Sequence, residues 1–156
     1  MLLIDGHWLT VHDGDARALA LLKRHYSYKR RARGRLRGNG LFVGPGEKMV
    51  LLTLNCLAVF VWQCSTVERR DGQDGVRCSI FRNETSVRSS DLIREAMQLA
   101  WLRWPGERLF TYVADAKVRS PNPGYCFKMA GWRYCGRNAD GRLSILEASP
   151  LLTVVG

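Results

Sequence analysis

Residues 108–146 read RLFTYVADAKVRSPNPGYCFKMAGWRYCGRNADGRLSIL, and this stretch decides the predicted fold. Leu109 to Val113 alternates in the manner of a strand. Asn122 is a favourable N-cap and Pro123 suits the first helical position, where its missing N–H costs nothing. A short helix is therefore predicted from Tyr125 to Ala130, directly after the turn that follows the strand.

Two further strands are predicted after this helix. Gly131 ends the helix, and residues 132–136 leave it as a strand. The pair Asp140-Gly141 is a strong hairpin signal that turns the chain back into residues 143–146. The stretch thus predicts a strand, a helix and a closing hairpin.

The chain before this stretch alternates between strands and helices. The segment 56–63 is apolar on both faces, which is typical of a central strand in a covered sheet. The predicted elements are strand 2–6, helix 16–26, strands 41–43, 49–53, 56–63 and 76–81, and helix 89–102. This order predicts an α/β fold with a mixed, mostly antiparallel central sheet flanked by helices.

Length and composition favour one domain over residues 1–156 and a polyanionic partner. The chain carries a net charge of +10 and 46% hydrophobic residues. A basic excess of this size is typical of nucleic-acid contact. The five cysteines are odd in number and lack paired-ligand spacing, so a reduced, cytoplasmic protein is expected. No apolar run is long enough for a membrane span, and no signal peptide is expected.

Residues 28–40 form a strongly basic arm. Its like charges repel one another, so a loop or a frayed helix is predicted. The position of the arm beside Tyr26 and Tyr28 favours phosphate contact combined with base stacking, whereas the alternative is a solvated basic loop without a partner. The candidate nucleic-acid contacts are Lys29, Arg30, Arg31, Arg33, Arg35 and Arg37.

Several short motifs carry a family resemblance. Residues 122–132 are similar to the last helix of GNAT-type N-acyltransferases, in which an Asn-initiated helix bears an aromatic residue and ends in Gly-aromatic. The spacing from Asp115 to residues 120–125, together with residues 25–27 and 81–84, resembles the Mom family of phage DNA-modification proteins, a divergent GNAT branch. This resemblance implies a GNAT-like single domain, an acyl-CoA such as acetyl-CoA, and phage DNA in a bacterial host as the substrate.

The same resemblance implies a coenzyme site at the strand–loop–helix from Val76 to Ala100. Free N–H groups at a helix start suit a diphosphate, and backbone N–H groups of a strand suit a thioester oxyanion. Ser and Arg stand where the family has glycines, and the two serines are alternatively plain helix caps. The candidate coenzyme contacts are Ser79, Ile80, Phe81, Arg82, Arg88, Ser89, Ser90, Asn122 and Tyr125.

Candidate catalytic residues lie at both ends of the chain. Asp115 follows a strand, where ligands of α/β sheets sit, and is expected to accept the proton of an attacking amine; alternatively it pairs with a nearby cation. The resemblance implies that Tyr125 donates a proton to the leaving thiolate in place of Phe127, which stands four residues before Gly131 and cannot donate; alternatively Tyr125 packs against the sheet. Further substrate contacts are expected from His25, Tyr26, Ser120 and Asn122.

The leading expectation is an acyltransferase that modifies a nucleobase amine in phage DNA. The resemblance implies adenine N6 or an amine on a hypermodified pyrimidine as the target, and evasion of restriction as the outcome. A GNAT enzyme acting on a small amine or a protein amine is the first alternative, and a non-enzymatic DNA-binding protein is the second. His25, Tyr26 and Asp115 are conceivable metal ligands, but their spacing does not indicate a metal site.

Overall fold

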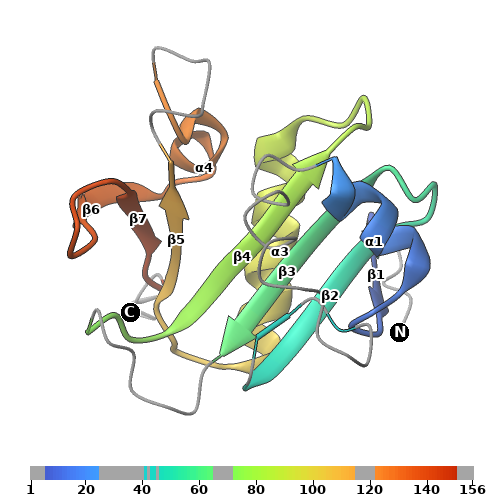
Figure 1. Cartoon of the computed structure of the whole chain (residues 1–156), viewed down its shortest axis with the longest axis horizontal. Coiled ribbons are helices and arrows are strands. Elements are labelled where there is room, and N and C mark those ends of the chain that lie inside the picture. Colours follow the sequence, from blue (N-terminus) through green and yellow to red (C-terminus); the bar gives the residue numbers. More distant parts are fainter. Residues whose placement is uncertain are drawn as a thin grey trace, which may run out of the picture.

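The structure is a computed structural model that describes residues 6–24, 41, 43–44, 46–64, 72–114 and 122–150. These residues form one α/β unit in which a seven-stranded sheet has the order β1-β2-β3-β4-β5-β7-β6 (Figure 1). Every neighbouring pair is antiparallel except β4 and β5, which are parallel. The mixed, mostly antiparallel sheet predicted from the sequence is confirmed.

Apart from the predicted strand 41–43, the elements follow one another in the predicted alternation. The strands are β1 (Trp8–Val11), β2 (Glu47–Thr53), β3 (Ala58–Cys64), β4 (Val76–Asn83), β5 (Leu109–Val113), β6 (Arg133–Arg137) and β7 (Ser144–Ala148). The helices are α1 (Ala16–Lys23), α3 (Ser89–Arg103) and α4 (Tyr125–Met129). None of the helices in the described residues is long and apolar enough to cross a membrane.

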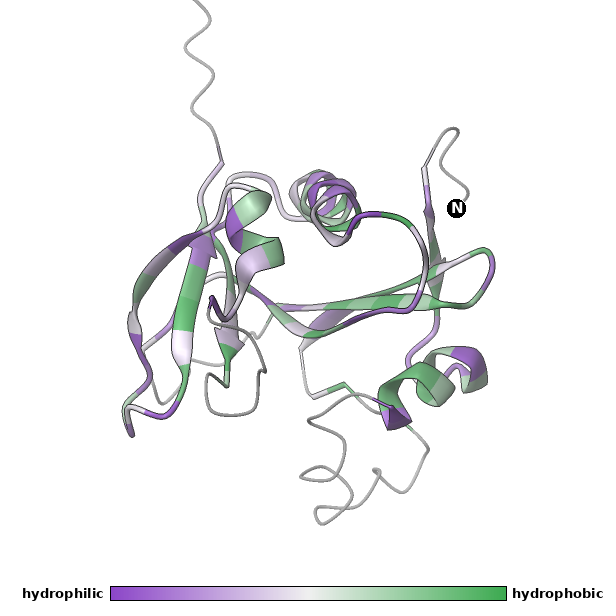
Figure 2. Cartoon of the chain, turned by 90° about the horizontal axis from the view of Figure 1, so that it is seen from above, coloured by the Kyte–Doolittle hydropathy of each residue, from purple (hydrophilic) through white to green (hydrophobic). Residues whose placement is uncertain are grey.

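The helices cover the two faces of the sheet. Viewed from above, α3 and α1 lie on opposite sides of the strands (Figure 2). Indole N–H groups fix α3 to its face, because Trp8 donates to the Leu92 carbonyl and Trp62 donates to the Ala96 carbonyl, both at 2.9 Å. Leu21 of α1 belongs to a second apolar cluster on the other face. The core is therefore two layers of side chains separated by the sheet.

The strand β3 has the central place that its sequence predicts. Its first five residues are buried, and it pairs with β2 on one side and β4 on the other. Phe60 and Trp62 point to the α3 face, where their ring centroids lie 4.6 Å apart. Val59 and Val61 point to the α1 face. Because both faces of the sheet are covered by helices, β3 carries apolar residues on both of its faces.

The first described strand is Trp8–Val11. The predicted strand 2–6 lies almost wholly outside the described residues and stays a prediction. The predicted strand 41–43 is wrong, because neither Leu41 nor Val43 belongs to a strand. The N-cap of α4 is Gly124 rather than Asn122, so Pro123 precedes the cap and is not the first helical residue. Gly124 has φ 76°, and a Cβ there would lie 2.5 Å from Leu146 Cδ1, so tertiary packing selects glycine at this position.

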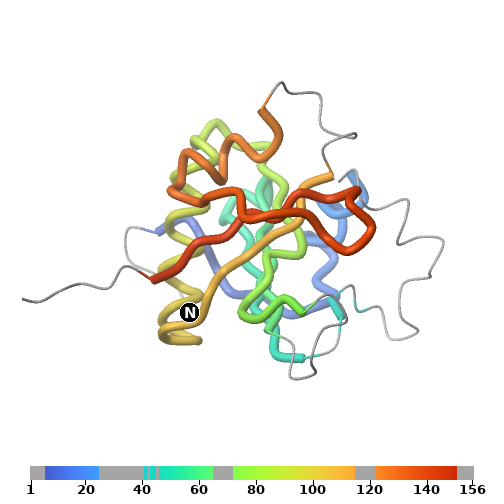
Figure 3. The backbone as a smooth tube through the Cα atoms, turned by 90° about the vertical axis from the view of Figure 1, so that its left-hand side faces the viewer, coloured from blue at the N-terminus to red at the C-terminus, as the bar shows by residue number. Residues whose placement is uncertain are grey.

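The closing hairpin is stabilised by a buried carboxylate. Glu147 of β7 accepts hydrogen bonds from Arg108 Nε at 2.8 Å and from Arg133 Nε at 2.9 Å. The hydrogen bond from Arg108, followed by that from Arg133, lowers the pKa of Glu147 against the opposing effect of burial. Figure 3 looks onto this end of the molecule, where the β6–β7 hairpin lies beside β5.

Replacing Glu147 by Gln is expected to lower the free energy of unfolding at pH 7 by about 2–3 kcal/mol, since two charge-assisted hydrogen bonds weaken. A depressed pKa adds stability above the ordinary carboxyl pKa of 4.5. That stability is lost as the pH falls through the lowered pKa of Glu147 in the folded state, so the difference in unfolding free energy between wild type and Glu147→Gln should shrink at acidic pH. Urea unfolding at pH 7 and at a pH below the ordinary carboxyl pKa measures this difference.

Asp91→Asn is the matched control for this change. Asp91 pairs with Arg94 at 3.0 Å, but both side chains are about half exposed. An exposed pair of this kind contributes at most about 1 kcal/mol. Equal losses in the two variants would show that the Glu147 cluster adds nothing beyond a surface ion pair.

Candidate functional site

The parallel strands β4 and β5 separate part-way along their length. Their register comprises Val76 with Leu109, Arg77 with Phe110 and Cys78 with Thr111. Beyond the last pair, β4 continues to Asn83. Its other edge stays paired with β3 over this stretch. The edge of β4 that faced β5 is thereby opened from Ser79 onward.

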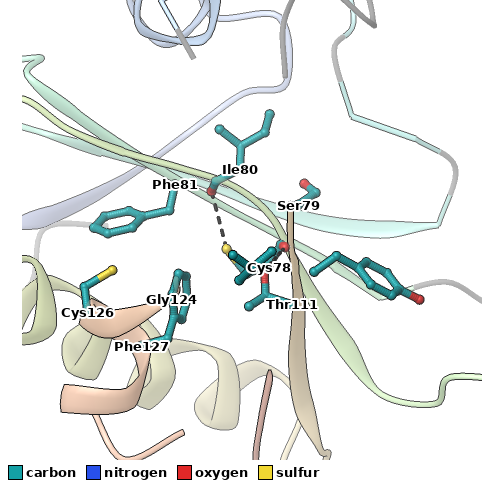
Figure 4. Close-up of a pocket in the computed structure, with 10 residues that line it drawn as sticks. Cys78, Ser79, Ile80, Phe81, Thr111, Gly124, Cys126 and Phe127 are labelled. Atoms are coloured by element: carbon teal, nitrogen blue, oxygen red, sulfur yellow. Dashed lines mark hydrogen bonds between the residues drawn. The ribbon is translucent and has the colours of Figure 1, made fainter. Parts of the chain in front are cut away.

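A cavity of about 190 Å³ lies where the strands separate (Figure 4). Residues 78–81 of β4 form one wall, residues 111–113 of β5 form another, and Gly124, Cys126 and Phe127 close it from the α4 side. Most of these groups are apolar. The sheet, rather than a surface loop, therefore shapes this pocket.

A β-bulge at Ser79 sets the direction of the side chains on β4. Val61 is opposite Ile80, whereas the next residue, Trp62, is opposite Cys78, so Ser79 is the extra residue. In a regular strand residues 78 and 80 would share a face. Here Cys78 packs with the α3 cluster and Ile80 packs with the α1 cluster. Figure 4 shows the two side chains on opposite sides of the strand. Bulges of this type often lie beside active sites.

The cavity wall contains two thiols among mostly apolar groups. Cys78 is fully buried, and its Sγ lies 3.5 Å from the Ile80 carbonyl, to which it donates. Burial raises the pKa of Cys78 far above its ordinary value and raises the pKa of Cys126 as well. Both thiols are therefore neutral near pH 7. Thr111 Oγ1 donates to the Cys78 carbonyl at 2.9 Å and closes the end of the ladder.

The loop between β4 and α3 is organised by Asn83. Its amide donates to the Val87 carbonyl at 2.8 Å and to Ser89 Oγ at 2.9 Å, and its Oδ1 accepts from the Thr85 N–H at 2.9 Å. These bonds fix the path of the chain into the helix. The start of α3 is thus held at the end of the strand that forms the cavity wall.

The prediction that Ser89 or Ser90 caps α3 is wrong. The N-cap is Arg88, which makes no side-chain capping bond among the described residues. Ser90 is only 3% exposed, so its hydroxyl lies away from solvent. Ser89 is engaged by Asn83 instead. The helix therefore presents its first backbone N–H groups without a side-chain cap, next to the exposed Arg88.

Arg82 is held in a surface ion cluster. Its Nε lies 3.0 Å from Glu84 Oε2, and Arg24 Nε lies 2.6 Å from the same oxygen. The hydrogen bond from Arg24 lowers the pKa of Glu84, with Arg82 contributing. This cluster joins the end of α1 to the loop before α3. Arg24 is the last described residue of this segment, and the basic arm lies outside the described residues.

Tyr125 is placed differently from Phe127 on α4. Two residues along a helix are separated by about 200°, so these side chains point in nearly opposite directions. Phe127 lines the cavity, whereas Tyr125 does not and is 55% exposed. Asn122 is exposed, and its Oδ1 accepts from Lys128 Nζ at 2.7 Å. The residue of α4 that brings a proton-bearing group to the cavity is Cys126.

Other candidate residues cannot be placed. The ten that lie outside the described residues are His25, Tyr26, Asp115, Ser120, Lys29, Arg30, Arg31, Arg33, Arg35 and Arg37. Within the described part of the chain, no group of three His, Cys, Asp or Glu side chains is arranged to hold a metal ion.

The structure brings Ser79, Ile80 and Phe81 together at the cavity wall. Sequence reasoning did not identify Cys78, Thr111 or Cys126 as wall residues. The position of Phe127, four residues before Gly131, is the one sequence signal that indicates which face of α4 meets the cavity.

Comparisons of this chain with protein-family models, with curated proteins and with solved structures found no match.

Proposed function

We propose that this chain is a Mom-like, GNAT-type acyltransferase that uses an acyl-CoA, such as acetyl-CoA, to modify a nucleobase amine in phage DNA. The observation that carries the proposal is the cavity between β4 and β5. The order of the elements and the single parallel pair fit the GNAT-like arrangement that the sequence motifs imply. DNA as the acceptor rests on the motifs and on the net charge of +10.

The open edge of β4 suits the arm of an acyl-CoA. That arm is an extended chain with two amide groups, and such a chain can pair with a strand edge as an added strand would. The apolar wall accepts the methylene groups beside them. Backbone N–H groups of Ser79–Phe81 would then polarise the thioester carbonyl, which is the role that an oxyanion hole plays.

The start of α3 suits the diphosphate of the same molecule. Uncapped backbone N–H groups at a helix N-terminus favour an anion, and Arg88 adds a formal charge at that position. Both features lie at the end of the loop that follows β4. The thioester and the diphosphate would therefore bind to consecutive elements, with Asp115, Ser120 and His25 proposed on the acceptor side.

The basic arm is proposed to hold the DNA backbone. Changing Arg30, Arg31, Arg33 and Arg35 together to Ala is expected to abolish DNA retention at physiological salt. The slope of log K against log salt should fall by about 3–4, because each phosphate contact contributes about 0.9. Fluorescence anisotropy with a duplex probe, across a salt series, measures both quantities.

A charge-matched control distinguishes the arm from the overall charge. The control removes four exposed arginines elsewhere, namely Arg94, Arg103, Arg137 and Arg142. If it weakens DNA binding as much as the arm variant does, the arm has no special role in DNA binding.

The chemical product provides the test of the function itself. Mass spectrometry of nucleosides from DNA of cells expressing this chain should reveal an acyl-derived base that is missing from cells without it. An unchanged nucleoside profile, in a host that supplies the native DNA substrate, would contradict the proposal. Acylation of small amines or of protein amines in its place would favour the first alternative, and DNA binding without acetyl-CoA affinity would favour a DNA-binding protein.

A further inference from the structure

Cys126 provides a thiol on the α4 side of the cavity. Figure 4 shows it on α4 beside Phe127, facing the part of β4 that contains Phe81. Its neighbour Tyr125 lies on the chain between two wall residues, but the tyrosine side chain is turned to solvent. On α4 the group that faces the cavity is therefore the Cys126 thiol, whereas the sequence motifs imply the Tyr125 phenol there.

We propose that Cys126 is the proton donor to the leaving thiolate when an acyl thioester reacts in this cavity. The inference rests on the proposed function, and it assigns a catalytic residue that the sequence motifs do not indicate. A thiol suits this task because it is protonated near neutral pH and the group that it must protonate is itself a thiolate.

The proton balance of the step is complete. The acceptor amine attacks the carbonyl carbon, so a C–N bond forms and the C–S bond breaks with its electron pair on sulfur. Cys126 gives its proton to that sulfur, which leaves as a free thiol. The proton released by the amine restores the Cys126 thiol, and no oxidant or further reactant is needed.

The other cavity-lining side chains that carry a proton on oxygen or sulfur are Cys78, Ser79, Thr111 and Tyr112. Thr111 Oγ1 already donates to the Cys78 carbonyl at 2.9 Å, and the Cys78 thiol donates to the Ile80 carbonyl at 3.5 Å. Phe127 has no proton to give. Tyr112 also lines the cavity, but its ring lies against the Arg77 guanidinium, 5.0 Å from the ring centroid.

The raised pKa of Cys126 disfavours a nucleophilic role, because it keeps the sulfur protonated. Burial is its main cause, partly opposed by hydrogen bonding to the backbone N–H groups of Phe127 and Cys126. A nucleophilic cysteine needs a thiolate, and such residues lie in electropositive surroundings that lower the pKa. The titratable side chains among the described lining residues are Cys78, Tyr112 and Cys126, none of which is a cation. The thiol therefore stays protonated.

The test compares Cys126→Ala and Cys126→Ser with wild type, using two acyl donors and duplex DNA as the acceptor. Acetyl-CoA affinity is measured separately by calorimetry, and product formation is followed by mass spectrometry. With acetyl-CoA the variants should react about 100-fold more slowly at an affinity within about twofold of wild type. With S-phenyl thioacetate, whose thiol leaves readily as a thiolate, the loss should shrink to about threefold or less.

Cys64→Ser is the matched control. Cys64 is another half-buried thiol whose pKa is raised by burial, but it lies at the end of β3 and does not line the cavity. It should react like wild type with both donors. Tyr112→Phe, which removes the phenol of a cavity-wall residue, should lose less activity with acetyl-CoA than Cys126→Ala does.

Several results would overturn the inference. An equal loss with both donors would indicate that Cys126 only shapes the site, and a Cys126→Ala rate within about twofold of wild type would exclude its role as the acid. A loss confined to Tyr112→Phe would assign the proton to the phenol. A wild-type protein that binds no acetyl-CoA would overturn the proposed function as well, and calorimetry distinguishes that failure from the others.

Discussion

Acetyl-CoA binding is expected to fall by about 100-fold or more when Cys126 is replaced by Trp, a loss of about 2.7 kcal/mol of binding free energy. Cys126 is part of the wall of a cavity of about 190 Å³, and an indole in its place would occupy the space between β4 and α4. Calorimetric titration with acetyl-CoA measures the effect. Circular dichroism verifies that the variant keeps its fold.

Tyr125→Trp provides the adjacent control. Tyr125 precedes Cys126 on the same helix, but its side chain is exposed and does not line the cavity. The same indole should leave acetyl-CoA affinity nearly unchanged there. If both variants bind like wild type, acetyl-CoA does not occupy this cavity.

Replacing Gly124 by Ala is expected to lower the free energy of unfolding by about 2–5 kcal/mol. Positive φ costs an L-residue about 1–2 kcal/mol, and an overpacked core costs about 1–3 kcal/mol more. The new Cβ would lie 2.5 Å from Leu146 Cδ1 and 3.3 Å from Val113 Cγ2, both of which are buried side chains. Urea unfolding measures the loss.

Gly131→Ala separates the two causes. Gly131 also has a positive φ, at 97°, but a Cβ there would meet nothing within 4 Å. Its loss should be limited to about 1–2 kcal/mol. An equal loss in both variants would show that the approach of Gly124 to Leu146 does not constrain the structure.

Elements with local signals could be predicted from the sequence. The hairpin between β6 and β7 follows from Asn138–Gly141, where the Gly141 N–H donates to the Asn138 carbonyl at 2.9 Å. The central place of β3 follows from a run that is apolar on both faces. The helix α1 begins after Asp15, whose carboxylate accepts from the Arg17 and Ala18 N–H groups as a cap does.

Features that depend on tertiary contact could not be predicted in the same way. The Gly124 cap is selected by Leu146, which is distant in the sequence, and Arg88 is the N-cap of α3 although the sequence favours a serine there. The cavity itself depends on where β4 and β5 stop pairing. The register between distant strands cannot be read from either strand alone. The position of Cys126 in the cavity wall therefore could not be predicted from the sequence.

The sequence places some of the candidate residues correctly at the cavity and places Tyr125 there wrongly. Ser79, Ile80 and Phe81 were expected at a ligand and do line the cavity, although their role in binding stays a prediction. Tyr125 was expected to face the same ligand, but the helical twist that turns Phe127 inward turns Tyr125 outward.

The most direct test is a titration of the 15N-labelled protein with acetyl-CoA, followed by amide chemical shifts, which suits a chain of 17.7 kDa. Saturable shifts should be largest for the amides of Ser79–Phe81 and Gly124–Phe127, because these two segments form opposite walls of the cavity. Shifts confined to other residues, or no shift at all, would contradict the proposal that a thioester binds between β4 and β5.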